Sequence, residues 1–242
     1  ACTVLVGELT PARNAMQWRA VNACILFLPM LDGKALLTVE SLAEGRALTP
    51  LQACMAANGS SQCGFCTPGF VMSLFALTKD LPAAAGEVWT SLSPIDDALA
   101  GNLCRCTGYA PIVRAAERAL AAPEADAFDA AHDRTLARLL ALRDDETVAV
   151  SGPKGRFFAP ATVQGLVDLM AEHPDATLVA GATDVALWVT KGLRVLDPVI
   201  WLGRVRGLRV VGEAADHLYL GAGVSLAEAG LHLSGLHPDL GE

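Results

Sequence analysis

The chain has 242 residues, of which 52% are hydrophobic and 18% charged, a composition typical of one or two globular domains and not of a disordered segment. Its net charge of −8 argues against a nucleic-acid partner, which would require a basic surface. No apolar run approaches the roughly 18 residues of a membrane span, so we expect no membrane partner. Seven cysteines, an odd number, and no signal peptide favour metal ligation in a reducing cytoplasm over disulfides.

The first part of the chain predicts a small sheet. Residues 3–6 are β-branched or apolar, end at Gly7 and indicate a strand. Residues 17–23 and 35–42 alternate in polarity and indicate two more strands. The chain lacks an initiator Met and starts abruptly, which suggests a piece of a longer protein.

Residues 48–122 predict two pairs of helices. Thr49 before Pro50, and again Thr67 before Pro68, have the cap-plus-proline pattern of a helix start. We expect helices at residues 50–58, 69–79 and 94–100, and a fourth that follows Pro111 and ends near residue 122. Residues 82–93 are expected to form a loop.

One cysteine pair lies in the connection within each helix pair. Cys63 and Cys66 are a Cys-x2-Cys pair, and Cys104 and Cys106 are a Cys-x-Cys pair. Thiolates brought together in this way hold a soft metal centre, either a tetrahedral zinc ion or an iron–sulfur cluster. Zinc pairs usually have two to four residues between the cysteines, so Cys-x-Cys favours iron and sulfide, with structural zinc and buried thiols as the alternatives. Gly64 would let backbone N–H groups approach the sulfurs.

The last part of the chain predicts alternating helices and strands. Residues 123–155 are acidic, alanine-rich and irregular, and we interpret them as a linker with one short helix over 134–143. From residue 157 we expect a helix capped by Thr162, a strand at 177–180, a helix ending near 191, and strands at 199–202, 208–212 and 217–220. The turn at 181–184 could bind a pyrophosphate, but it lacks a GxGxxG pattern, so spacing alone favours an ordinary turn.

Two strings resemble one known family. GSSQCGFCTPGFVMS and LAGNLCRCTGYAPIVRAA resemble the all-helical [2Fe–2S] domain of the xanthine dehydrogenase and aldehyde oxidase family of molybdenum hydroxylases. The resemblance implies an α+β fold. Its parts would be a partial β-grasp ferredoxin-like domain at 1–44, a four-helix [2Fe–2S] bundle at 45–122, the linker at 123–155, and the N-terminal part of a PCMH-type FAD-binding domain at 156–242.

The resemblance also assigns further residues. Its ferredoxin domain has a C-x4-C-x2-C run and a later fourth cysteine, which implies that Cys2 and Cys24 are the third and fourth ligands of a second [2Fe–2S] cluster, the first two preceding residue 1. Taken alone, these two cysteines leave the question open. Cys54 has no partner, and we expect a small buried side chain. Gln62 would reach the molybdopterin of a partner chain or domain, a plain polar loop residue being the alternative.

The string LVAGATDVALWVTK resembles the first FAD-contacting loop of the family's flavin domain. The FAD contacts implied are Thr177, Leu178, Val179, Ala180, Gly181, Ala182, Thr183 and Asp184. Ala182 stands where a glycine or asparagine is expected. The second flavin loop would lie beyond Glu242.

The function implied by the resemblance is electron transfer in the small subunit of a xanthine dehydrogenase. Electrons would pass from a molybdopterin site on a large partner chain through two [2Fe–2S] clusters to FAD and NAD⁺, within a cytoplasmic heterotetramer of two small and two large chains. No side chain here is assigned a catalytic acid or base role. Small subunits of aldehyde oxidase or carbon monoxide dehydrogenase type, and a non-enzymatic zinc-binding module, are the alternatives.

Overall fold

A computed structural model describes residues 2–10, 15–43, 45, 47–80 and 94–240. The chain divides into two compact units, unit 1 with Ala1–Cys24 and Gly33–Arg143, and unit 2 with Ile25–Asp32 and Asp144–Glu242. The backbone therefore passes from one unit to the other three times. Within the described ranges, every helix is too short or too polar to cross a bilayer.

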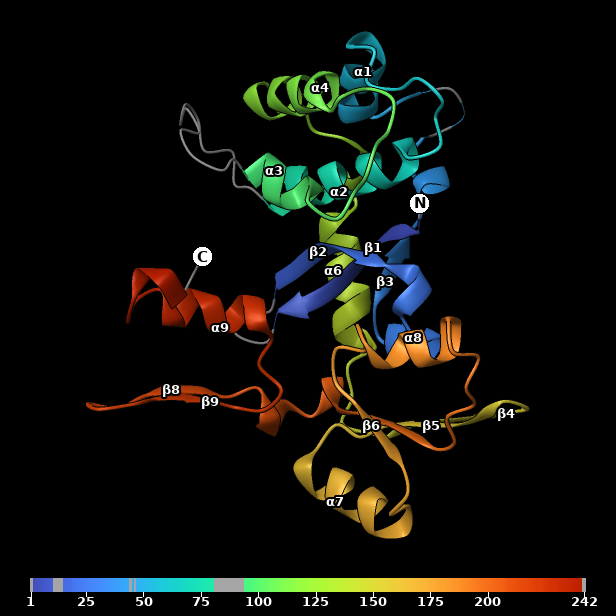
Figure 1. Ribbon diagram of the computed structural model, residues 1–242, viewed down its shortest axis with the longest axis vertical. Coiled ribbons are helices and arrows are strands. Elements are labelled where there is room, and N and C mark those ends of the chain that lie inside the picture. The colour runs from blue at the N-terminus through green and yellow to red at the C-terminus, as the bar shows by residue number, and fades with distance from the viewer. Residues whose placement is uncertain (1, 11–14, 44, 46, 81–93, 241–242) are drawn as a thin grey trace. The chain divides into compact units, whose positions relative to one another are not determined.

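Unit 1 combines an antiparallel sheet with helices, in agreement with the predicted α+β class (Figure 1). Its elements are β1 Thr3–Thr10, β2 Ala15–Asn22, β3 Ala35–Leu37, α1 Pro50–Ala57, α2 Thr67–Asp80, α3 Pro94–Leu99, α4 Ala110–Ala121, α5 Ala127–Ala130 and α6 His132–Ala141. The strand order is β2-β1-β3. The third strand is shorter than predicted because residues 39–41 form a 3-10 turn. The predicted loop at 82–93 lies outside the described residues.

The four helices α1 to α4 pack together, and α2 also packs against β1 and β2. Thr49 starts α1 with a full capping box, in which its side chain and that of Gln52 each accept a backbone N–H. Fully buried Phe70, Phe75 and Ile112 belong to one apolar core that includes residues of the sheet. Helices and sheet in unit 1 therefore share a single core, which fixes the connections between the helices against the first strand.

The stretch 123–155 is more ordered than the irregular linker expected. α6 corresponds to the short helix predicted at 134–143, α5 precedes it, and α6 packs against β1 and β2 with Leu139 buried in the unit 1 core. Asp126 caps α5, and Lys79 of α2 forms a 2.8 Å ion pair with the carboxylates of Asp126 and Asp129. Residues from 148 already belong to a strand. Composition could not show this, because alanine-rich acidic segments suit a helix as well as a linker.

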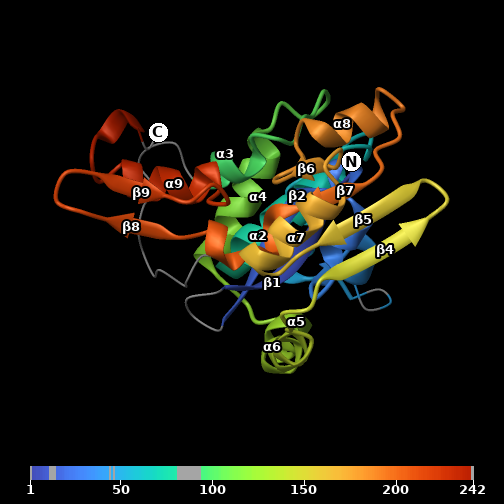
Figure 2. The ribbon, with the colours of Figure 1, turned by 90° about the horizontal axis from the view of Figure 1, so that it is seen from below.

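Unit 2 is built on a four-stranded sheet of order β4-β5-β7-β6 with a β4–β5 hairpin that Figure 2 shows from below. Its elements are β4 Val148–Gly152, β5 Gly155–Ala159, α7 Val163–Glu172, β6 Thr177–Val179, α8 Val185–Thr190, β7 Val199–Trp201, β8 Val211–Glu213, β9 Leu218–Leu220 and α9 Leu226–Leu233. β7 pairs in parallel with both β5 and β6. The strand predicted at 208–212 begins only at Val211, because residues 206–208 form a 3-10 turn.

The two faces of this sheet bury different cores. Val199 and Trp201 pack on one face with residues of α8, whereas Ile200 between them packs on the other face with Leu166 of α7. This is the alternation expected of a strand covered on both faces. The sheet therefore places the turn after β6, which leads into α8, at one end of a doubly covered sheet.

The segment Ile25–Asp32 lies early in the sequence but belongs to unit 2. Met30 is 2% exposed and belongs to the core that contains Phe157, Val199 and Trp201. The rings of Phe27 and Phe157 lie 6.3 Å apart. At the end of the segment, Asp32 and Asp144 both form ion pairs with Arg204, at 3.2 and 2.7 Å. Unit 2 thus completes its core with residues that directly follow Cys24.

Candidate functional site

The first cysteine loop runs from the end of α1 to the start of α2. Gly64 has a φ of +81°, a conformation that favours glycine, and its carbonyl accepts the N–H of Thr67. The hydroxyls of Ser61 and Thr67 lie 2.7 Å apart across the loop. The Cys66 carbonyl accepts the first N–H groups of α2. These contacts hold Cys63 at the exposed side of the loop and Cys66 half-buried at the helix start.

The second cysteine loop lies between α3 and α4 and is held by Thr107 and Tyr109. The N–H of Cys104 donates to the Tyr109 hydroxyl at 3.0 Å, and the Thr107 hydroxyl lies 3.1 Å from the Cys104 sulfur. The N–H groups of Cys106 and Thr107 point to the same sulfur at 3.5 and 3.4 Å. Cys104 is therefore surrounded by donors, which stabilise a thiolate.

The two loops meet through a buried hydrogen bond and through their sulfurs. The Ser60 hydroxyl, buried at the end of α1, donates to the Pro111 carbonyl in α4 at 2.9 Å. The sulfurs of Cys63 and Cys106 lie 3.4 Å apart. The Cys66 and Cys104 thiols are close enough for each to influence the pKa of the other. The four cysteines predicted as one ligand set thus come together in two close pairs.

Hydrogen bonds and burial shift the acidity of these thiols in opposite directions. The Thr107 hydroxyl, helped by neighbouring backbone N–H groups, lowers the pKa of Cys104 from 9.0 to about 7. A backbone N–H two residues further on lowers the pKa of Cys63. Burial raises the pKa of Cys66, and donation to Cys63 raises that of Cys106. One thiol of each pair is therefore biased toward the thiolate that binds metal, and the other would lose its proton on binding.

The chemistry of the four thiols suits a cysteine-ligated metal centre. In the part of the chain that the structure describes, no three His, Cys, Asp or Glu side chains form a group that could hold a metal ion as they stand. Four cysteine thiolates are the ligand set of a structural zinc ion or of a [2Fe–2S] cluster. Backbone N–H groups directed at sulfur also suit such a cluster, because they raise its reduction potential. The donor set therefore fits iron and sulfide.

Cys2 and Cys24 form a second, separate pair of sulfurs. They lie 3.1 Å apart, and the N–H of Ala23 donates to the Cys2 carbonyl at 2.9 Å. The Cys24 thiol lowers the pKa of Cys2. Both residues are exposed, at adjacent ends of the paired strands β1 and β2. The family resemblance assigned both cysteines to one cluster. The antiparallel pairing of Thr3 with Asn22 explains why the two sulfurs lie close together. Cys54 packs half-buried against the unit 1 core.

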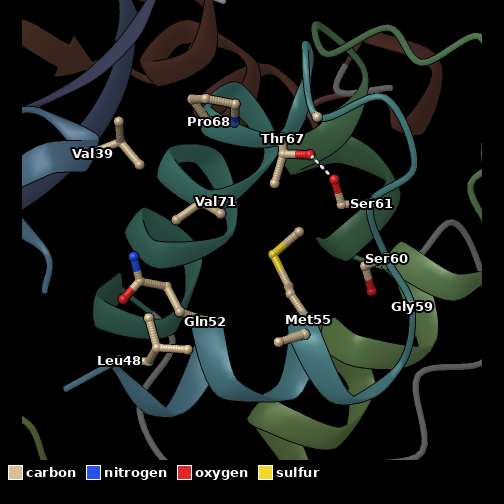
Figure 3. A pocket seen from close by; sticks show the side chains of 12 residues that line it. Val39, Leu48, Gln52, Met55, Gly59, Ser60, Ser61, Thr67, Pro68 and Val71 are labelled. Carbon is tan, nitrogen blue, oxygen red and sulfur yellow. Dashed lines mark hydrogen bonds between the residues drawn. The ribbon is translucent and has the colours of Figure 1, made fainter. Parts of the chain in front are cut away.

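A cavity of about 440 Å³ opens beside the first cysteine loop (Figure 3). Its lining includes the apolar side chains of Val39, Leu48, Met55 and Val71, and Ser61, Gly64 and Thr67 line it on the loop side. The neighbouring Gln62 is exposed. The loop that carries Cys63 and Cys66 thus borders a cavity, and the side chain of Gln62 in the same loop is exposed to solvent.

The candidate flavin loop follows β6. Ala180, Gly181, Thr183 and Asp184 are exposed, whereas Ala182 is buried with a φ of +67°. The Trp201 indole N–H donates to the Ala180 carbonyl at 2.9 Å and holds the loop against β7. The left-handed conformation explains why a glycine or asparagine is expected at residue 182. Four of these five loop residues are exposed, so the loop is accessible to a ligand.

Sequence reasoning did not find the residues that hold the cysteine loops. Ser60, Thr107 and Tyr109 act through hydrogen bonds that depend on the folded positions of α1 and α4. A signal was nevertheless present in the string CRCTGY, where Gly108 and Tyr109 both adopt positive φ. A tight turn directly after a cysteine pair indicates backbone donors near sulfur.

Two domain-family models match the chain in sequence order. The model described as [2Fe–2S] binding domain matches residues 38–117, and the model described as FAD binding domain in molybdopterin dehydrogenase matches residues 152–241. The chain corresponds to the iron–sulfur and flavin region of the molybdenum hydroxylase family. The predicted α+β fold, with a [2Fe–2S] domain and part of an FAD-binding domain, is confirmed.

Known relatives of this molybdenum hydroxylase region include enzymes with different names. Xanthine dehydrogenase of Emericella nidulans is 28% identical over 94% of this chain and 19% of its own length. Aldehyde oxidase 1 of Rattus norvegicus is 34% identical over 93% of this chain and 20% of its own length. The chain thus spans about a fifth of these relatives, and their similarity does not separate xanthine dehydrogenases from aldehyde oxidases.

A solved structure of quinoline 2-oxidoreductase from Pseudomonas putida 86 is also similar to this molybdenum hydroxylase region. It is 28% identical, and the similarity covers 55% of this chain and 68% of that chain. The TM-score is 0.38, so the superposition adds no argument about the fold.

Proposed function

We propose that this chain transfers electrons from a molybdopterin site on a partner chain or domain to FAD through two [2Fe–2S] clusters. The observation that carries the proposal is the 3.4 Å approach of the Cys63 and Cys106 sulfurs from two separate helical loops, with Cys66 and Cys104 close enough to influence each other's pKa. A chance gathering of buried thiols would not be surrounded by backbone and hydroxyl donors. When bound, the clusters and the flavin supply the redox chemistry.

In this proposal the chain's own residues bind and tune each centre. Cys63, Cys66, Cys104 and Cys106 ligate one cluster. Hydrogen bonds from Thr107 and nearby N–H groups to the Cys104 sulfur favour the reduced, more negative form of that cluster. The domain boundaries proposed are the bundle at 45–122 and the flavin segment at 156–242, and the strand β4 from Val148 joins the flavin segment because it belongs to the same sheet.

Cys2 and Cys24 ligate the second cluster in this proposal, with two more ligands from outside this sequence. Thr177 to Asp184 form the first FAD-contacting loop. The support is the 3.1 Å approach of the two sulfurs and the exposure of most residues in the loop after β6.

The proposed partner surface lies at the end of unit 1 that carries the cysteine loops. Phe65 directly precedes Cys66, and Leu103 directly precedes Cys104. Their side chains are 82% and 79% exposed. Large apolar side chains on two loops that meet favour a protein contact over open solvent. We propose that Gln62 reaches a molybdopterin held by that partner, and its exposure on the first cysteine loop supports this role.

We propose a purine such as xanthine as the substrate oxidised by the partner, and NAD⁺ as the acceptor, in a cytoplasmic assembly of two small and two large chains. Support for xanthine comes from relatives named xanthine dehydrogenase. An aldehyde is the second candidate, because aldehyde oxidase 1 is the more identical of the two relatives compared above.

The test replaces one proposed ligand and one cysteine outside the ligand set. In the complete enzyme, Cys104→Ser should abolish one of two [2Fe–2S] signals in electron paramagnetic resonance and leave the other unchanged. Cys54→Ser is the matched control and should keep both signals, because Cys54 packs against the core and lies in neither cysteine pair.

The outcomes distinguish an iron–sulfur cluster from a bound zinc ion, and two clusters in the enzyme from one. A colourless wild-type protein with one tightly bound zinc per chain would reject the proposal. Loss of both signals, or of neither, in Cys104→Ser would show that the two-cluster assignment is wrong.

A further inference from the structure

Three side chains form a hydrogen-bonded chain between the two cysteine regions of unit 1. The Ser73 hydroxyl donates to the Asn102 side-chain oxygen at 2.6 Å, and the Asn102 amide nitrogen donates to the Thr3 hydroxyl at 3.3 Å. Ser73 lies in α2, the helix that starts next to Cys66. Asn102 is two residues before Cys104, and Thr3 directly follows Cys2.

This chain connects parts of the fold that are far apart in the sequence. Thr3 and Asn102 are 99 residues apart, and Ser73 and Asn102 are 29 apart. Asn102 is also held by its own backbone, whose N–H donates to the Leu99 carbonyl at 2.8 Å. A side chain fixed at its backbone and bonded at both ends of its amide has little freedom to change rotamer.

The connection does not depend on which way the amide is assigned. Serine and threonine hydroxyls both donate and accept, so turning the amide over keeps a bond at each end. Ser73 is only 5% exposed, so its hydroxyl depends on Asn102 in the folded chain. A side chain with a donor at one end and an acceptor at the other is therefore required at residue 102.

We propose that Asn102 is a positioning residue that sets the separation and orientation of the two clusters. The proposal rests on the proposed function, because it needs a cluster at Cys104 and another at Cys2. Asn102 ties the backbone just before one ligand to the backbone just after the other, through a single side chain. The shared core keeps the helices and the sheet together without this bond, so loss of the Asn102–Thr3 bond should leave the ligands in place and change only the local position of residues 102–104 relative to Cys2.

The experiment uses the complete enzyme with both clusters loaded and reduced. Thr3→Val removes the hydroxyl at nearly constant shape, and Thr3→Ser keeps it. Asn102→Ala removes both bonds. Measured are the iron content, the midpoint potential of each cluster, and the magnetic splitting between the two reduced clusters, which falls steeply with their separation.

We expect Thr3→Val and Asn102→Ala to retain full iron but to show a changed splitting and a shifted potential, while Thr3→Ser matches the wild type. If Asn102→Ala does not fold, Thr3→Val against Thr3→Ser decides. Equal splittings and potentials in these two variants would overturn the proposal. So would iron loss in Thr3→Val, because the Thr3 side chain would then serve to retain a cluster rather than to space two. A wild type without two distinct signals would instead refute the proposed function.

Discussion

Met30 lies in the segment Ile25–Asp32, which follows Cys24. Its packing predicts that this side chain stabilises unit 2. Met30 is 2% exposed and packs with Phe157, Val199 and Trp201 in the unit 2 core. Truncation of a buried methionine to alanine costs about 2–5 kcal/mol, because it removes apolar contacts and leaves a cavity. Met30→Ala should therefore destabilise unit 2 by that amount and leave unit 1 nearly unchanged.

Hydrogen exchange followed by mass spectrometry can read the two units separately. A loss of 2 kcal/mol or more should speed exchange of the amides in β6 and β7 by about thirtyfold or more, if these amides exchange through opening of the whole unit. Amides of α2, in unit 1, should keep their wild-type rates. Met30→Leu, which nearly conserves volume, should cost less than about 1.5 kcal/mol.

The control lies in the same segment. Leu28 is 78% exposed, so Leu28→Ala should change stability by no more than about 0.5 kcal/mol. The reasoning is refuted if Met30→Ala exchanges like Leu28→Ala in β6 and β7. A larger increase of the exchange rate over wild type in α2 than in β7 would equally refute it, because Met30 would then belong to the core of unit 1.

Two further predictions concern the thiols and the flavin loop. In the metal-free chain, iodoacetamide should modify Cys104 first, with a rate that rises through about pH 7, because only the thiolate reacts and its pKa is lowered from 9.0 to about 7. Cys66, whose pKa is raised, should stay slow until above pH 9.0, and equal rates at pH 7 in peptide mass spectrometry would contradict this. Trp201→Phe removes the N–H bonded to the Ala180 carbonyl and should weaken FAD binding about two- to tenfold, measured by flavin fluorescence. An unchanged dissociation constant would show that this bond does not hold the loop in its binding conformation.

Local signals in the sequence were enough to predict the helical part and its cysteines. Thr49 and Thr162 cap the helices that begin one residue later, as predicted, because capping depends only on the next few residues. The spacing of Cys63, Cys66, Cys104 and Cys106 indicated one site because each pair lies in a turn between helices. The structure brings these sulfurs together through the bond from Ser60 to Pro111.

Long-range placement could not be predicted in the same way. The apolar run at 25–31 reads as a buried segment, but its sequence does not say which of two cores it enters. Asn102 carries no signal for Thr3, because a hydrogen bond across 99 residues depends on the packing of α2 against β1. The short β8 and the additional helix α5 differ from expectation because tertiary contacts outweigh weak local preference there, whereas α6 agrees with the helix predicted at 134–143.

The interleaved division of the chain also has a consequence for its synthesis. The segment Ile25–Asp32 is synthesised long before its packing partners in β5 and β7. At about 5–20 residues per second, this apolar stretch waits roughly ten to thirty seconds before it can be covered. A nascent chain that ends before Val199 therefore exposes an apolar segment that favours aggregation.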